Sequence, residues 1–145
     1  LLIDAQDCEN HNIELLNTYH EIEKNEVRFE EVMTEDAEVL ITAYGTPARI
    51  AITVAENLRA RGIKAGVFRP ITLWPFPSKR LQEIAEQDSV KVILDVEMST
   101  GQMLDDVNLA VAERKPVRFY GRYGGVIPTV SEIEAAAEKA LGEVK

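Results

Sequence analysis

A repeated alternation of short apolar runs and amphipathic segments constrains the fold of this chain more than any other feature of its sequence. Apolar runs that are typical of buried strands occur at 39–41, 63–68, 90–96 and 116–120. After each run, apolar residues recur at three- and four-residue spacing, which is the period of a helix with one buried face. Strands separated by helices favour parallel pairing through right-handed crossovers. The sequence therefore predicts an open α/β sheet.

Local signals predict where the helices begin and end. Thr46 and Pro47 are expected to be the N-cap and the first residue of one helix, and Gly62 is expected to end it. The capping-box spacing predicts two further helix starts, at Ser99 with Gln102 and at Thr129 with Glu132. The residues expected to face the core are Ile50, Val54, Leu58, Leu81, Ile84, Ala85, Met103, Val107, Ala110, Val111, Ile133, Ala137, Ala140 and Leu141.

The first quarter of the chain precedes this alternation and predicts a helix followed by an edge strand. Residues 8–26 carry apolar side chains at three-residue spacing, which predicts a helix with a narrow buried stripe made of Ile13, Leu16, Tyr19 and Ile22. Residues 27–33 alternate weakly and predict an edge strand, where Glu30 and Glu31 would discourage unwanted pairing. Because the chain starts at Leu1 without an initiator methionine, we expect residues 1–26 to be a helical lead-in from a preceding domain. Residues 27–145 are expected to form one α/β domain.

Composition and charge narrow the classes of partner. The chain has 145 residues, of which 46% are hydrophobic, so it can bury a core. Its 25 acidic and 16 basic residues give a net charge of −9, which makes nucleic acid and anionic lipid poor partners. No apolar run approaches the roughly 18 residues of a membrane span. Cys8 is the single cysteine, which excludes an intrachain disulfide and fits a reducing cytoplasm, the expected location.

Four irregular loops follow the predicted strands and should share one edge of the sheet, where ligands or partners of parallel sheets bind. The loop at 69–77 holds Trp74 among three prolines, so it can insert rigidly into a partner surface, or it can fold back over its own core. Arg122 and the glycines after it offer a second contact point. The candidate interface residues are Tyr44, Thr46, Trp74, Phe76, Glu97, Gln102, Arg122 and Tyr123.

Each feature with catalytic potential also has a structural interpretation. A desolvated Glu97 can act as an acid or base, yet a carboxylate there also stabilises the start of the next helix, and no second carboxylate or histidine close in sequence is expected to pair with it. The helix at Thr46 can receive an anion or simply be capped. His11 and His20 are nine residues apart, unlike paired metal ligands, and no G-x-S-x-G elbow is present. The sequence therefore predicts no complete active site.

Four stretches of this sequence, at 43–49, 69–77, 97–103 and 119–125, together resemble the alpha subunits of 2-oxoacid:ferredoxin oxidoreductases. The resemblance runs from about His11 to about Leu141 and is strongest to the branch that acts on 2-oxoisovalerate (ketoisovalerate) or 2-oxoglutarate, with pyruvate as a further substrate of such enzymes. It implies a transketolase C-terminal-domain-like fold. Such a fold is a five-stranded open sheet of order 1-3-2-4-5 with helices on both faces and the first strand antiparallel.

The resemblance also implies a function for the parent protein, which is oxidative decarboxylation of a 2-oxoacid to an acyl-CoA with reduction of ferredoxin. Thiamine diphosphate, magnesium and an iron–sulfur cluster would belong to a pyrimidine-binding domain before Leu1 and to beta and gamma subunits. This chain has neither a Gly-Asp-Gly motif nor cluster cysteines. We therefore expect a domain without cofactor that serves subunit assembly and is inactive alone.

Two alternatives remain open at the level of sequence. One is a domain of another thiamine-dependent transketolase-type enzyme, although the stretch at 120–125 argues against it. The other is a freestanding α/β binding module without catalysis, with a small acidic ligand at the helix of Thr46.

Overall fold

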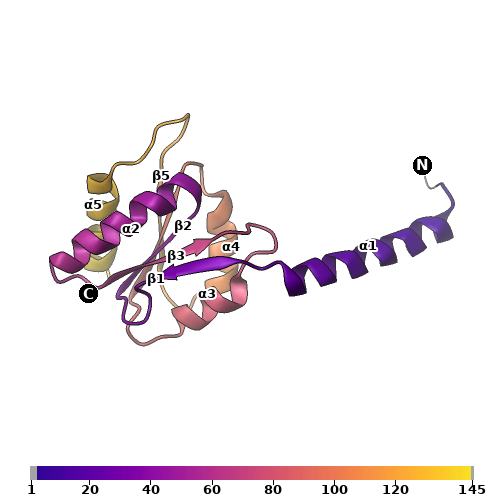
Figure 1. The fold of residues 1–145 in the computed structure, drawn as a ribbon, viewed down its shortest axis with the longest axis horizontal. Helices are drawn as coiled ribbons and strands as arrows, with labels where there is room; N and C mark the ends of the chain where they lie inside the picture. Colours follow the sequence, from indigo (N-terminus) through magenta and orange to yellow (C-terminus); the bar gives the residue numbers. More distant parts are fainter. Residues whose placement is uncertain (1–2, 145) are drawn as a thin grey trace.

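The computed structural model describes residues 3–144 and shows one open sheet between two layers of helices (Figure 1). Strand β1 is antiparallel to β3, and the other neighbouring strands are parallel. This topology confirms the expected order 1-3-2-4-5 with an antiparallel first strand. In spatial order the strands are β1 (Phe29–Val32), β3 (Ala65–Pro70), β2 (Val39–Ala43), β4 (Val92–Glu97) and β5 (Val117–Gly121).

Each face of the sheet is covered by a pair of helices. On one face α2 (Gly45–Ala60) packs beside α5 (Val130–Gly142), and on the other α3 (Ser78–Ala85) packs beside α4 (Gln102–Val111). Because helices cover both faces, every residue of the central strands β2 and β4 is buried. Of the residues predicted to face the core, Ile50 is half-buried and the others are buried.

Of the four predicted helix starts and ends, the end at Gly62 and the start at Thr129 are confirmed. The helix predicted to begin behind Thr46 begins earlier, at Gly45. Gly62 has φ +85° and donates its N–H to Arg59, so it ends α2 as predicted. The capping box of Thr129 and Glu132 starts α5. The prediction that Thr46 is an N-cap was wrong, because α2 begins at Gly45 behind Tyr44. Pro47 is tolerated as the third helical residue since the first four N–H groups of a helix have no intrahelical partner.

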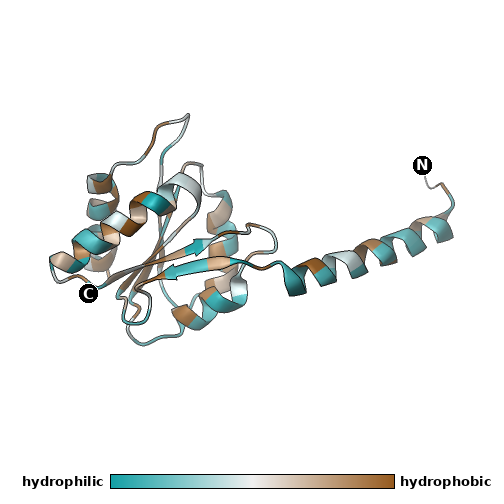
Figure 2. Ribbon diagram, in the orientation of Figure 1, coloured by the Kyte–Doolittle hydropathy of each residue, from teal (hydrophilic) through white to brown (hydrophobic). Residues whose placement is uncertain are grey.

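Helix α1 (Ala5–Asn25) points away from the rest of the domain (Figure 1). The prediction of a buried stripe was wrong, because Ile13 is 51% and Leu16 is 53% exposed. The spacing specified a helix correctly, but burial needs a surface to pack on, and both sheet faces are already covered. Figure 2 shows apolar residues scattered along this helix among polar ones. Within residues 3–144 no helix has both the length and the apolar character needed to cross a membrane.

Gly66 allows β3 to approach the connection between β1 and β2. A Cβ atom at this position would lie 2.5 Å from the carbonyl oxygen of Met33 and 3.0 Å from the Cβ of Ala37. We expect Gly66→Ala to lower the free energy of unfolding by about 2 kcal/mol, because the backbone must move to admit the methyl group. Denaturant unfolding followed by circular dichroism measures this change. Gly142→Ala, with nothing within 4 Å, is the matched control and should leave stability nearly unchanged or slightly higher.

Candidate functional site

The carboxyl end of the sheet gathers the predicted contact residues. Strands β2, β3, β4 and β5 run in parallel, so the loops that follow them lie at the same end of the sheet. Tyr44 and Thr46 follow β2, and Trp74 and Phe76 follow β3. The remaining four candidates are at the end of β4 or after it and β5: Glu97, Gln102, Arg122 and Tyr123. The structure therefore groups these residues at one rim, as the sequence predicted.

Glu97 is fully buried and caps helix α4 with its side chain. The carboxylate accepts hydrogen bonds from the backbone N–H groups of Met103 (3.1 Å) and Leu104 (2.9 Å). The hydroxyl of Ser99 also donates to it, at 2.6 Å. The predicted capping box of Ser99 with Gln102 was therefore wrong, since the preceding strand already supplies the acceptor and Gln102 is exposed. Of the two interpretations of Glu97, the structure supports the helix-stabilising one.

Asp95 is a second buried carboxyl group next to Glu97. It lies two residues earlier on the same strand face and accepts a hydrogen bond from the hydroxyl of Thr42 at 2.8 Å, while its other oxygen has no donor beside it. Burial, with a further contribution from Glu97, raises the pKa of Asp95 to about 8. When Asp95 is protonated, its second oxygen can donate a hydrogen bond to Glu97, so that neither oxygen of Asp95 lacks a partner.

The two carboxyl groups share one negative charge. Burial alone raises the pKa of Glu97, but hydrogen bonds from Asp95, Ser99 and the N–H groups at the start of α4 outweigh it and lower the pKa below its usual value. An acid beside a carboxylate is a pairing that enzymes use in proton transfer. Here neither side chain has exposed surface, so the pair cannot meet a substrate and instead ties β2, β4 and α4 together.

The expectation that Glu97 has no carboxylate partner close in sequence was wrong. Asp95 lies two residues before Glu97 in the same strand. The sequence predicted that this strand is buried on both faces, and that prediction could have indicated a paired carboxylate. A carboxyl group in such a strand needs a partner on its own face, and residues i and i+2 share a face.

The loop after β3 divides into an inward and an outward part. Pro75 and Pro77 are buried, and the half-buried Phe76 packs against the core on the face of the sheet covered by α3 and α4. Trp74 is 56% exposed and touches the ring of Tyr19 edge-to-face, with centroids 5.7 Å apart. The inward part of the loop thus folds back over the core, as one interpretation predicted, whereas insertion of Trp74 into a partner surface stays a prediction. The inward half anchors the loop, and the outward half presents Trp74 beside the exposed Ile71 and Leu73.

The loop between β5 and α5 is fixed at its base and open at its tip. Arg122 donates its N–H to the carbonyl of Glu97 (3.1 Å), and its guanidinium lies 2.8 Å from Glu132. The tip projects from the domain (Figure 1) and exposes Tyr123, Val126 and Ile127. The guanidinium of Arg122 is thus engaged within the chain, and the free contact surface is the apolar tip.

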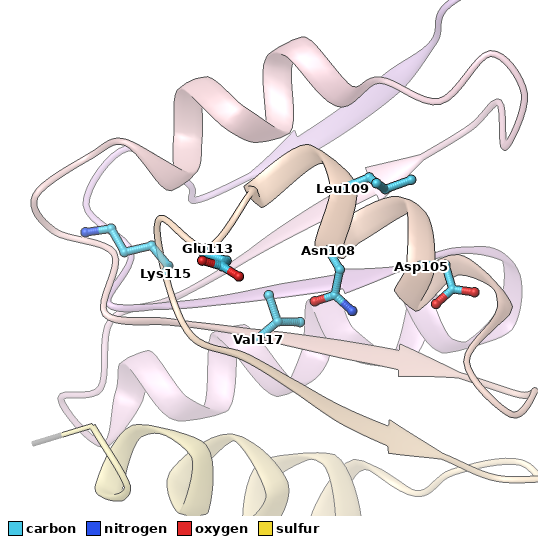
Figure 3. A pocket seen from close by; sticks show the side chains of 6 residues that line it. All are labelled: Asp105, Asn108, Leu109, Glu113, Lys115 and Val117. Atoms are coloured by element: carbon cyan, nitrogen blue, oxygen red, sulfur yellow. The ribbon is translucent and has the colours of Figure 1, made fainter.

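Two of the open hollows in the surface lie beside the features described above. The first, of about 500 Å³, lies between α1 and the loop after β3 and is lined by Leu16, Tyr19, His20, Glu23 and Trp74. The second, of about 620 Å³, lies beside α4 and β5 (Figure 3). Its lining residues are Asp105, Asn108, Leu109, Glu113, Lys115 and Val117.

Comparison with known proteins connects this geometry to a family. The family "Pyruvate:ferredoxin oxidoreductase core domain II" matches residues 37–133, more than half of the chain. The chain belongs to this family. Among solved structures, this chain resembles a 2-oxoglutarate:ferredoxin oxidoreductase from Magnetococcus marinus with a TM-score of 0.79 and 18% sequence identity. The match covers 97% of this chain and 24% of that one. A split gene transketolase matches with a TM-score of 0.67 and 25% sequence identity, over 81% of this chain and 42% of that one. These likenesses show a transketolase-type fold.

Curated relatives share sequence over most of the chain. Ketoisovalerate oxidoreductase subunit VorB of Methanothermobacter marburgensis is 41% identical over 99% of this chain and 40% of its own length. The 2-oxoglutarate synthase subunit KorA of the same organism is 35% identical over 69% of this chain and 26% of its own length. This chain therefore spans less than half of the length of these relatives.

Within residues 3–144 no three His, Cys, Asp or Glu residues are grouped so that they could hold a metal ion. Cys8, His11 and His20 all lie exposed on α1. Thr46 is exposed in the first turn of α2, and its anion site stays a prediction.

Proposed function

We propose that this chain is the C-terminal domain of the alpha, VorB-type subunit of a thiamine-dependent 2-oxoacid:ferredoxin oxidoreductase. The reaction of the whole enzyme would convert a 2-oxoacid and CoA to an acyl-CoA and carbon dioxide and pass two electrons to ferredoxin. The family match over residues 37–133 and the 41% identity to a ketoisovalerate oxidoreductase subunit support this proposal. The same identity favours 2-oxoisovalerate over 2-oxoglutarate or pyruvate as the substrate.

The proposed role of this domain is to hold the enzyme together, without catalytic or cofactor-binding residues of its own. Thiamine diphosphate, magnesium and the iron–sulfur cluster would be held by other domains and by beta and gamma subunits. Residues 1–26 would lead in from a pyrimidine-binding domain of the same polypeptide, and this proposal is supported by helix α1, which projects from the rest of the domain (Figure 1). The whole assembly is proposed to work in the cytoplasm.

The observation that carries the assembly role is a set of exposed apolar side chains on helix α1 and on the loops after β3 and β5. We call it the assembly surface and define it as Tyr19, Ile71, Leu73, Trp74, Tyr123, Val126 and Ile127. A tryptophan held by buried prolines loses little conformational entropy on binding, so it can contribute strongly to affinity. Exposed aromatic clusters of this kind are typical of protein interfaces.

Trp74→Ala in the complete complex is expected to weaken subunit association by roughly tenfold to a hundredfold, the range for an aromatic hot spot. The isolated domain should keep its stability, since Trp74 is 56% exposed and its ring contacts Tyr19 of the projecting helix α1 rather than the core. Analytical ultracentrifugation and thermal unfolding measure the two effects. Phe76→Ala is the matched control on the same loop and should lower stability instead. Undisturbed association of both Trp74→Ala and Tyr123→Ala complexes would contradict the assembly role.

The catalytic part of the proposal is tested by viologen reduction. The reconstituted complex should reduce the dye in the presence of CoA and a 2-oxoacid, with its highest kcat/KM for 2-oxoisovalerate among 2-oxoisovalerate, 2-oxoglutarate and pyruvate. Absence of reduction with all three acids would overturn the proposed reaction, whereas a different ranking would overturn only the substrate.

A further inference from the structure

The two edges of the sheet are protected differently. On β1, Glu30 pairs with Arg69 at 3.0 Å and Glu31 pairs with Arg80 at 2.7 Å, so charged side chains line that edge. On the opposite edge, β5 has the sequence VRFYG, with neither an acidic residue nor a proline, and its one charged side chain, Arg118, pairs with Glu143 of α5 at 2.7 Å. An unprotected edge strand is a template on which another strand can pair.

The outward backbone groups of β5 can be assigned from its pairing with β4. The carbonyl of Pro116 accepts from the N–H of Ile93, and the N–H of Arg122 donates to the carbonyl of Glu97. Even-numbered residues therefore bond to β4. Because successive residues of a strand point their backbone groups to opposite sides, the N–H and C=O groups of Val117, Phe119 and Gly121 point away from the sheet. Consistent with this, the guanidinium of Arg118 turns back to the outward carbonyl of Val117, at 3.2 Å.

The helices leave this edge open on both faces. Helix α5 packs chiefly on α2 and β4, and α4 packs on α3 and β4, so β5 lies beyond the helical layers. On the α4 face the hollow of about 620 Å³ opens beside Val117, and Leu109 stands at it with 78% of its side chain exposed (Figure 3). On the α5 face a smaller hollow of about 150 Å³ is lined by residues that include Arg118 and Tyr120.

We propose that β5 pairs antiparallel with β5 of a second copy of this chain, about a two-fold axis at Phe119, and so joins two sheets into one. In this register Phe119 opposes Phe119 of the second copy, and Val117 opposes its Gly121. All of these are outward-pointing residues, so the three pairs exchange N–H···O=C bonds in both directions. A two-fold arrangement closes on itself and uses the same patch on both copies.

The side chains of β5 are complementary to themselves in this register. On the α5 face Arg118 opposes Tyr120 of the second copy, and the symmetry repeats this cation–aromatic pair. On the α4 face Val117 opposes the second copy's Gly121, beside which the Phe119 ring of that copy packs. Leu109 lines the hollow next to Val117 and is exposed. No two like charges face each other along the strand. Each copy carries a net charge of −9, so association should strengthen as salt screens the overall repulsion.

The test measures the mass of this 145-residue chain in solution by light scattering at about 100 µM, a concentration suited to a small interface. The expected mass is twice 16.2 kDa. Phe119→Pro removes an outward donor that the chain's own sheet does not use, so it should weaken dimerisation at least about tenfold and preserve the fold. Phe29→Pro is the matched control on the β1 edge, where Phe29 also lies outward, and it should remain dimeric.

Two further measurements keep the proposal decidable if Phe119→Pro fails to fold. Leu109→Arg, at an exposed position, should give a folded monomer. Amide hydrogen exchange at Val117, Phe119 and Gly121 should be slow in the wild type and fast in this variant. A monomeric wild type with rapid exchange at these amides overturns the proposal. So does a dimer that both variants leave intact, or protection that appears only when another subunit is added.

Discussion

Glu97→Ala lowers the free energy of unfolding of this domain by about 3–5 kcal/mol, the range for removing one partner of a buried charged network. The substitution removes the acceptor for two backbone N–H groups at the start of α4 and for the hydroxyl of Ser99. It also leaves Asp95 without the group that accepts its proton. Since both side chains are fully buried, water does not replace the lost partners.

Urea unfolding monitored by circular dichroism measures this loss. Glu97→Gln should lie between the wild type and the alanine variant, because its amide oxygen still accepts at the helix start while its NH₂ group faces donors. Glu86→Ala is the matched control, an exposed glutamate paired with Arg114 at 2.9 Å, and should change stability little. An alanine variant at position 97 as stable as the control variant would show that the buried network does not hold α4 in place.

The domain loses stability as the pH rises from 5 toward 9, and Asp95 is the cause. Its pKa is raised from 3.8 to about 8 in the folded protein, first by burial and then by Glu97. Between these two values the folded state binds a proton that the unfolded state has released, so stability falls with rising pH by up to about 1.4 kcal/mol per pH unit. The loss is complete above pH 8 and absent below about pH 4. Glu97, whose pKa is lowered, acts in the opposite sense and only at acid pH.

Asp95→Asn should abolish most of this loss. The amide oxygen keeps the bond from Thr42, and the amide NH₂ donates to Glu97 without carrying a titratable proton. We expect stability close to that of the wild type at pH 5 and higher by on the order of 4 kcal/mol at pH 9, the slope summed from pH 5 to about 8.

The measurement is a set of urea unfolding curves at pH 5, 7 and 9. Asp106→Asn is the control, since burial followed by Asp105 and Glu97 also raises the pKa of Asp106, but its side chain is only half-buried. That variant should retain the alkaline loss. A pH profile of Asp95→Asn that matches the wild type would disprove the shared proton.

The buried pair and the apolar loops have separate roles at the same rim. The carboxyl groups fix the end of β4 and the start of α4, and the carbonyl of Glu97 holds Arg122 at the base of the next loop. Trp74 and the tip at Tyr123 project beyond this fixed base. A firm scaffold below an exposed apolar surface suits a domain that positions other subunits, in agreement with the proposed function.

Periodicity and local signals determined most of the fold. The alternation of apolar runs and helical stripes specified four parallel strands with intervening helices, because each element must bury one face or both. The glycine at 62 and the capping box at Thr129 specified helix ends that depend only on neighbouring residues. The order of the strands came with the family resemblance, and the structure confirmed it.

Tertiary structure decided the features that depend on residues far apart in the chain or on partners outside it. Whether the stripe on α1 is buried depended on a free surface, and the sheet offered none. The start of α4 was decided by a carboxylate from the preceding strand rather than by Ser99. The proton on Asp95 is retained because the packed sheet and helices bury this side chain, with a further contribution from Glu97. Sequence spacing fixes local conformation and the face on which a residue lies, whereas burial, ionisation and exposed surface follow only from the packing of the whole chain.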